Sequence, residues 1–307
     1  MDLLRTALLA GSTSVCLREQ LTRRPFFRRA VSRFMPGEHL GDALGACRTL
    51  HGAGVGTLLT CLGENVTTAD DARAVADHYV EAIGRISDAG TGTQLSVKLT
   101  QLGLDLGLED CLDNLRRIAE ASSTHEQIVW IDMEASQYVD ATLEIFRRAR
   151  AETPYVGVCL QAYLHRTAAD LEALLPLGPA VRLVKGAYRE PADVAIARKA
   201  DVDRNFEALA ARLVEPKAQA AGAFVGLGTH DRSLIDRLIR LTADTPRIGF
   251  DFEMLYGIHG SLQQRLVSDG YPLRVLISYG SQWFPWYMRR LAERPANLWF
   301  VLKSLSR

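Results

Sequence analysis

Polar and charged residues recur at the ends of short apolar segments throughout this sequence of 307 residues. In chain order they are Glu64, Lys98, Asp132, Gln161, Lys185, Thr229, His230, Asp231, Glu253 and Tyr279. A lysine at such a place can form a Schiff base or hold an anion as a fixed positive charge, and the residues alone leave both open. Asp132 follows four apolar residues. Because a buried carboxylate needs a partner, we expect Asp132 to pair with Lys98.

A second group of candidate residues lies near the C-terminus, in WFPWYMRRLAERPANLWF. Arg289 and Arg290 are adjacent, and on a helix their side chains would point about 100° apart. One helix edge could then offer two guanidinium groups to a carboxylate or a phosphate, with Glu293 within pairing reach. A solvated surface helix is the simpler interpretation, but the flanking aromatic residues favour a ligand or a partner here.

Alternating strand-like and helix-like segments would position these residues. The short apolar segments predict strands at 56–61, 94–99, 128–133, 156–161, 181–186, 222–230, 247–255 and 273–280. Between them, segments such as 110–121 and 234–243 have apolar residues at helical spacing. Eight buried strands in this alternation predict an α/β fold, a (β/α)8 TIM-type barrel, whose chemistry lies at the C-terminal ends of the strands.

A doubly wound open sheet is the competing architecture, and it usually carries a G-x-G-x-x-G sequence after its first strand. The nearest candidate, Gly52-Ala53-Gly54, precedes the first predicted strand and has Thr57 where the last glycine is required. The sequence therefore favours the closed barrel. We expect two parts, an N-terminal helical arm at 1–45 and the catalytic barrel at 46–307.

Composition and charge exclude several classes of protein. Lysine plus arginine and aspartate plus glutamate both number 36, so the formal net charge of zero argues against a nucleic-acid binder. Five scattered cysteines without a CxxC pair indicate reduced thiols and no zinc site. With no apolar run of about 18 to 20 residues and no basic leader, we expect a cytoplasmic protein. The arginines of the arm predict at most a peripheral contact with the inner face of a membrane, and a solvated helix is the simpler interpretation.

Seven segments together resemble the proline dehydrogenase family, flavin-dependent (β/α)8 enzymes of proline catabolism. They are LSVKLTQLGLD, WIDME, VGVCLQAYLHRT, VRLVKGAY, GTHD, FDFEMLYG and YMRRLAERPANL, in the family's order between about residues 95 and 298. The arm and the segment LLTCLGENV are also similar to single-function bacterial members. The resemblance specifies no oligomeric state.

The resemblance implies that FAD binds across the mouth of the barrel without a Rossmann fingerprint. The residues that would contact it are Asp132, Met133, Gln161, Arg182, Leu183, Val184, Lys185, Gly186, Ala187, Tyr188, Thr229 and His230. Arg182 would lie near N5 of the flavin, where a cation favours the reduced ring. Asp132 and Arg182 would be the catalytic residues. No metal is implied.

The resemblance also implies a small cyclic amino acid as the substrate. The residues that would contact it are Lys98, Leu255, Tyr256, Leu276, Trp286, Arg289, Arg290 and Glu293, with Lys98 and the two arginines holding the carboxylate. The implied reaction is hydride transfer from L-proline to the flavin, which gives 1-pyrroline-5-carboxylate, with a quinone receiving the electrons. Such a reaction needs no protein nucleophile, so positioning should supply most of the rate.

Three positions depart from the family's usual pattern. Leu276 and Trp286 stand where tyrosines are usual, and both would face the substrate ring. Glu253 stands where glutamine is usual, and its negative charge would disfavour the reduced flavin. The same flavin chemistry on hydroxyproline, a larger ring or a biosynthetic analogue is therefore an alternative. A Schiff-base lyase that uses Lys98 is a remote one, because it leaves the paired arginines without a role.

Overall fold

The computed structural model describes residues 31–284, and these residues form a closed barrel of parallel strands. The strands are β1 (Gly56–Cys61), β2 (Gln94–Val97), β3 (Val129–Ile131), β4 (Val156–Gln161), β5 (Ala180–Val184), β6 (Phe224–Gly228), β7 (Phe250–Leu255) and β8 (Leu273–Tyr279). Each strand pairs with its neighbour in sequence, and β8 closes the barrel by pairing in parallel with β1 from Gly56↔Arg274 to Cys61↔Tyr279. The predicted barrel is confirmed.

Some strands end earlier than the sequence predicts. Strand β2 ends at Val97, β3 at Ile131 and β5 at Val184. Lys98, Asp132 and Lys185 are therefore one residue beyond the C-terminal ends of their strands. This is the edge of the barrel at which side chains can converge on a ligand.

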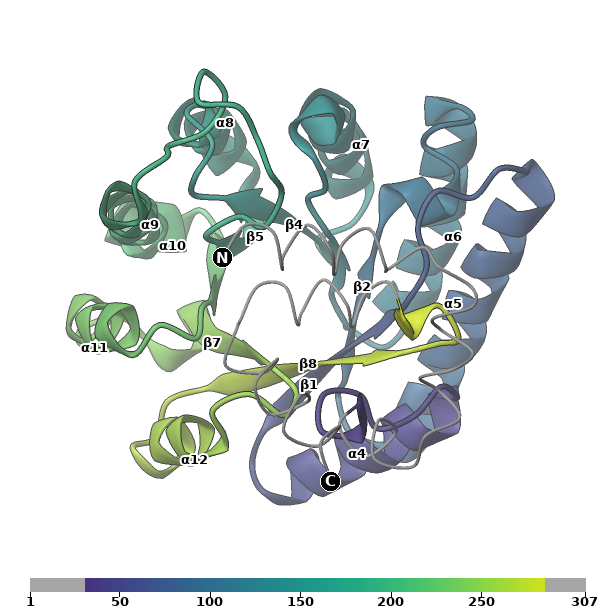
Figure 1. The fold of residues 1–307 in the computed structure, drawn as a ribbon, viewed down its shortest axis with the longest axis horizontal. Helices are drawn as coiled ribbons and strands as arrows, with labels where there is room; N and C mark the ends of the chain where they lie inside the picture. The colour runs from purple at the N-terminus through teal and green to yellow at the C-terminus, as the bar shows by residue number, and fades with distance from the viewer. Residues whose placement is uncertain (1–30, 285–307) are drawn as a thin grey trace, which may run out of the picture.

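Helices surround the barrel on its outer side (Figure 1). They are α4 (Leu40–Gly52), α5 (Ala69–Ala89), α6 (Leu108–Ser123), α7 (Val139–Glu152), α8 (Thr167–Leu174), α9 (Lys199–Val214), α10 (Pro216–Ala220), α11 (Arg232–Leu241) and α12 (Gly260–Ser268), with 3₁₀ turns at Leu99–Leu102, Ser136–Tyr138, Leu175–Leu177 and Arg247–Gly249. Local signals delimit α5: Thr68 caps its start by accepting from the amide of Asp71, and Gly90 ends it at φ +62°. Among residues 31–284, no helix combines the length and apolar character needed to cross a bilayer.

Helix α4 belongs to the ring of helices. It packs outside β1 and β8, between α12 and α5 (Figure 1), and it buries Leu40, Ala43, Leu44 and Cys47. The predicted boundary at residue 45 falls inside this helix. The basic part of the arm, at 1–30, lies outside the described residues.

The middle of the barrel is filled by Trp130, which is fully buried. Its ring packs with Leu58 and Ala180, and its Nε1 donates to Oε1 of Gln94 at 2.7 Å. Gly157 on β4 leaves room for this ring, because a Cβ at that position would lie 2.6 Å from Cε3 of Trp130. Trp130 thus forms an apolar layer beneath the C-terminal mouth.

The substitution Gly157→Ala tests this layer. The added methyl group must displace the Trp130 ring, so we expect the free energy of unfolding to fall by about 1 to 3 kcal/mol. Urea denaturation measures the change. Gly84→Ala is the matched control, because a Cβ at Gly84 in α5 meets nothing within 4 Å, and it should stabilise by about 0.5 to 1 kcal/mol. An unchanged midpoint for Gly157→Ala would show that Trp130 is not held as described.

Candidate active site

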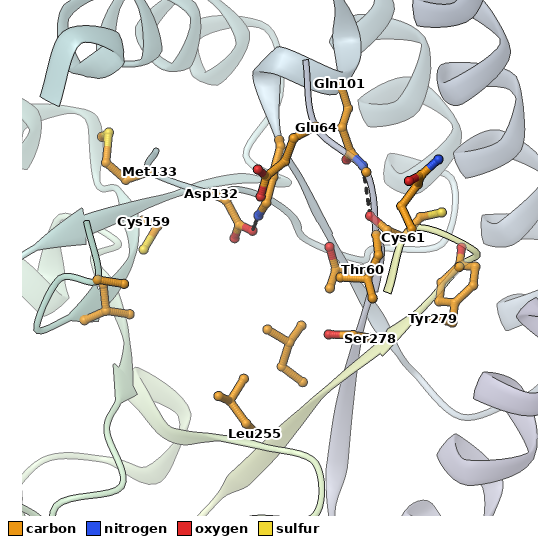
Figure 2. A pocket seen from close by; sticks show the side chains of 18 of the residues that line it. Thr60, Cys61, Glu64, Gln101, Asp132, Met133, Cys159, Leu255, Ser278 and Tyr279 are labelled. Atoms are coloured by element: carbon orange, nitrogen blue, oxygen red, sulfur yellow. Dashed lines mark hydrogen bonds and ion pairs between the residues drawn. The ribbon is translucent and has the colours of Figure 1, made fainter. Parts of the chain in front are cut away.

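A cavity of about 1600 Å³ opens at the C-terminal ends of the strands. Figure 2 shows side chains from several strands facing it, among them Asp132 and Met133 after β3, Cys159 on β4 and Leu255 on β7. Of the residues singled out from the sequence, the cavity is lined by Glu64, Lys98, Asp132, Met133, Gln161, Arg182, Val184, Lys185, Gly186, Ala187, Tyr188, Thr229, His230, Asp231, Glu253, Leu255, Leu276 and Tyr279. Residues separated by more than 200 positions in sequence therefore share one cavity.

Two predicted site residues do not line this cavity. Leu183 alternates with Arg182 and Val184 along β5, so its side chain points outward and is buried against the helices. Tyr256 follows β7 and packs against the outer core. Trp286, Arg289, Arg290 and Glu293 lie outside the described residues.

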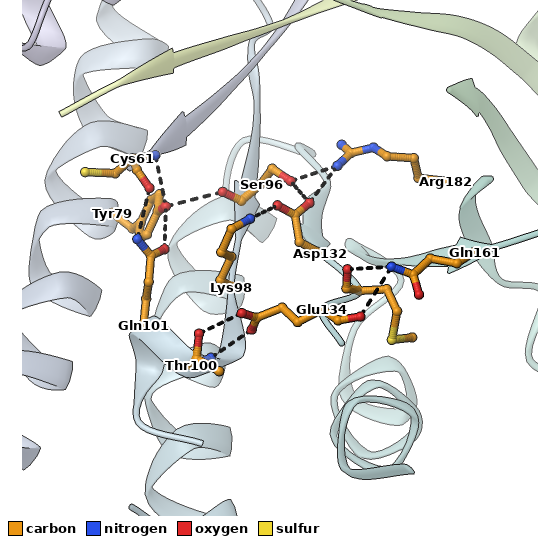
Figure 3. A network of polar contacts seen from close by, with 11 residues as sticks. Cys61, Tyr79, Ser96, Lys98, Thr100, Gln101, Asp132, Glu134, Gln161 and Arg182 are labelled. Atoms are coloured by element: carbon orange, nitrogen blue, oxygen red, sulfur yellow. Dashed lines mark hydrogen bonds and ion pairs between the residues drawn. The ribbon is translucent and has the colours of Figure 1, made fainter. Parts of the chain in front are cut away.

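Lys98 and Asp132 form an ion pair at the wall of the cavity. Nζ of Lys98 lies 2.6 Å from Oδ2 of Asp132, and both side chains are largely buried. The hydroxyl of Ser96 donates to Oδ1 of the same carboxylate at 2.6 Å (Figure 3). The pairing predicted from the sequence is thus present, with Ser96 as a second donor.

Arg182 connects this pair to the opposite part of the barrel. Its Nη1 donates to Oδ1 of Asp132 at 3.0 Å and to Oγ of Ser96 at 2.8 Å. Its Nε donates to Oε2 of Glu253 at 2.6 Å. The guanidinium lies 4.8 Å from the ring centroid of Trp130, so the aromatic layer supports it from below.

Electrostatics keep both members of the Lys98 pair ionised. Burial alone would raise the pKa of Asp132, but the charges of Lys98 and Arg182 bring it below its ordinary value. Burial alone would lower the pKa of Lys98, but the carboxylate of Asp132 raises it above its ordinary value. The site therefore presents a permanent cation near neutral pH.

The end of β4 adds a polar group, and the loop after β5 brings its backbone close to the cavity. Gln161 donates through Nε2 to the carbonyl oxygens of Met133 and Glu134 (Figure 3). Gly186 has φ +117°, and a Cβ there would lie 2.2 Å from the Tyr163 ring. Only glycine fits this strained and crowded position, which brings the backbone after β5 against the cavity.

Lys185 and His230 are held by specific contacts. Nζ of Lys185 lies 3.0 Å from Oδ2 of Asp231 and also contacts Asp203. Asp231 in turn caps α11 through the amide of Leu234. His230 accepts from the amide of Leu255 at 2.8 Å through Nε2, which ties the ends of β6 and β7 together.

Three residues of this site were not expected from the sequence. Ser96 precedes Lys98 by two residues on a strand, so the period of two could have placed it on the same face. Glu134 accepts from the amide and hydroxyl of Thr100, and its acidic side chain in WIDME was the only available signal. Trp130 is one of the four apolar residues before Asp132 in the sequence, and only its position under Arg182 gives it a role here.

Some buried polar atoms that line the cavity have no partner among the described residues. They are Oε1 of Gln161, Nη2 of Arg182, Oε1 of Glu253 and Oγ1 of Thr60. Leaving such groups unpaired costs roughly 1 to 3 kcal/mol each. A bound polar ligand is one way to satisfy them. Within 31–284, no cluster of three His, Cys, Asp or Glu side chains could hold a metal ion.

A closed eight-stranded barrel with converging charged groups at its C-terminal mouth defines an enzyme of the (β/α)8 class. The family model for proline dehydrogenase matches residues 43–303. The chain therefore belongs to the proline dehydrogenase family, a family of oxidoreductases.

Individual relatives agree with this assignment. Proline dehydrogenase 1 of Bacillus subtilis (strain 168) is 37% identical over 281 residues, which cover 91% of each chain. Proline dehydrogenase of Deinococcus radiodurans is 37% identical over 294 residues, covering 94% of this chain and 93% of the relative. The crystal structure of proline utilization A (PutA) from Bdellovibrio bacteriovorus inactivated by N-propargylglycine superposes with a TM-score of 0.81 at 20% identity. This chain covers 36% of that longer protein and is itself covered to 94%. At 20% identity the likeness shows the fold alone.

Acid titration tests the ionised state of Asp132. Its folded-state pKa lies below the unfolded value of about 3.9, so its stabilising contribution is present above that pH and is lost as the pH falls through the folded pKa. We expect the free energy of unfolding to fall less steeply below about pH 4 in Asp132→Asn than in the unsubstituted protein. Urea denaturation across this range measures it, with the exposed Asp70 as the Asp70→Asn control. Equal pH dependence in all three proteins would contradict the ion pair.

Proposed function

We propose that this protein oxidises L-proline to 1-pyrroline-5-carboxylate with bound FAD as the hydride acceptor and a quinone as the final electron acceptor. Membership of the proline dehydrogenase family carries the proposal. The fixed cation of Lys98 at the wall of the cavity supports it, because an amino-acid carboxylate needs such a partner.

The residues around the cavity fit FAD. Buried atoms of Gln161 and Arg182 lack partners among the described residues and could bond to the polar edge of a flavin. The backbone at Gly186 approaches the cavity closely. The residues that would hold the cofactor are Asp132, Met133, Gln161, Arg182, Val184, Lys185, Gly186, Ala187, Tyr188, Thr229 and His230. When bound, FAD supplies the acceptor for a hydride.

The protein's own residues would bind and orient the substrate. Lys98 would hold the carboxylate, while Asp132 keeps the lysine in place through the 2.6 Å contact. Leu255 and Leu276 give the cavity apolar surface for the ring. Arg289 and Arg290 would complete the carboxylate site, in a part of the chain beyond the described residues. The ring nitrogen must be unprotonated for hydride loss, and positioning then supplies most of the rate.

The alternatives considered from the sequence are not favoured. A Schiff-base lyase needs a neutral lysine, whereas Asp132 raises the pKa of Lys98 above its ordinary value. Leu276 lines the cavity, and nothing in the described site selects an altered ring over proline. Peripheral membrane contact through the basic arm stays a prediction.

Anaerobic addition of L-proline to the purified protein tests the proposal. We expect a yellow protein that loses its visible absorbance and forms 1-pyrroline-5-carboxylate, detected with o-aminobenzaldehyde. Lys98→Met should retain FAD yet weaken the apparent affinity for proline by about 2 to 5 kcal/mol, because the carboxylate loses a buried cation. A protein that cannot be loaded with FAD, or a loaded protein that L-proline does not reduce, would contradict the proposal. Unchanged affinity in Lys98→Met would show that the lysine does not hold the carboxylate.

A further inference from the structure

Glu253 is a buried carboxylate that faces the barrel interior from β7 and contacts Arg182. Its residue is 5% exposed, and its Oε2 accepts from Nε of Arg182 at 2.6 Å. The two residues are 71 positions apart in sequence. Since both side chains are 5% exposed, solvent screens this ion pair little.

A glycine on the neighbouring strand leaves room for the contact between Glu253 and Arg182. Gly226 on β6 lies beneath Glu253, and a Cβ there would come within 2.3 Å of Oε1 of Glu253. The missing side chain leaves space for the carboxylate. Oε1 of Glu253 and Nη2 of Arg182 are both buried without a partner among the described residues. The pair thus makes one hydrogen bond and leaves one guanidinium nitrogen for another acceptor.

Glu253 also completes an alternating row of charges. The row runs from Lys98 to Asp132, from Asp132 to Arg182 and from Arg182 to Glu253, through contacts of 2.6, 3.0 and 2.6 Å. Two cations and two anions sum to zero. Without the carboxylate of Glu253, the same row would carry one net positive charge at the base of the cavity.

We propose that Glu253 is a positioning residue of this enzyme: it holds Arg182 with Nη2 left to donate to the cofactor, and its charge lowers the reduction potential of bound flavin. The inference rests on the proposed function. A positive charge stabilises a ring that gains negative charge on reduction, and Glu253 cancels part of the charge that Arg182 supplies.

The charge effect is tested with Glu253→Gln. Glutamine keeps the size of the side chain and an oxygen that can accept from Nε of Arg182, but it removes the charge. We expect the midpoint potential of bound FAD, measured anaerobically against a reference dye, to become more positive. Asp170→Asn is the control: Asp170 is a largely buried carboxylate that pairs with Arg166 and does not line the cavity, so its loss should shift the potential less.

The positioning effect is tested with Glu253→Asp. Aspartate keeps the charge but draws the carboxylate back by one methylene, so Arg182 loses its anchor. We expect FAD to bind roughly tenfold more weakly or worse, while the potential shifts less than in Glu253→Gln. This variant keeps the positioning effect falsifiable if Glu253→Gln does not fold.

The outcomes separate this inference from the proposed function. An unsubstituted protein that does not bind FAD, or that L-proline does not reduce, would overturn the proposed function. If that protein behaves as proposed, an unchanged potential in Glu253→Gln or an equal shift in Asp170→Asn overturns the charge effect. Unchanged FAD affinity in Glu253→Asp overturns the positioning effect.

Discussion

Ionised groups inside a barrel must find partners, because transfer of an unpaired charge from water into the protein interior costs several kcal/mol. In this protein the requirement is met by a row of contacts from Lys98 through Asp132 and Arg182 to Glu253. Each member comes from a different strand or strand end, so the row exists only when these strands are assembled in the barrel. Removing one member leaves its neighbour buried and unpaired. Folding and the charge state of the cavity are therefore linked.

The row determines what the cavity offers to a ligand. Asp132 keeps Lys98 protonated, so the lysine serves as a fixed cation and not as a nucleophile. The layer formed by Trp130 closes the barrel beneath Arg182, which leaves the spare guanidinium nitrogen near the cavity. A cationic wall, an apolar wall and unpaired polar atoms together suit an apolar ring that carries a carboxylate, beside a flat polar cofactor.

The fold could be predicted because buried strands and amphipathic helices alternate with clear periods. The Lys98–Asp132 pair could also be predicted, because the two residues end neighbouring strands and one is a carboxylate in an apolar segment. The pairing of Arg182 with Glu253 could not, because β5 and β7 are not neighbours in the barrel and the contact depends on the space above Gly226. The outward direction of Leu183 follows from the alternation of side chains along a strand. The resemblance to the family does not specify that direction. The contribution of Arg289 and Arg290 lies beyond the described residues.

A double-substitution cycle on Lys98 and Asp132 tests most directly whether these two members of the row act as one unit. The cycle compares kcat/KM for L-proline in Lys98→Met, Asp132→Asn and the combined variant, each loaded with FAD. If the pair acts as a unit, the loss in the combined variant falls short of the summed single losses by at least about 1 kcal/mol. Losses that add within about 0.5 kcal/mol would contradict the account, because the two residues would then act independently.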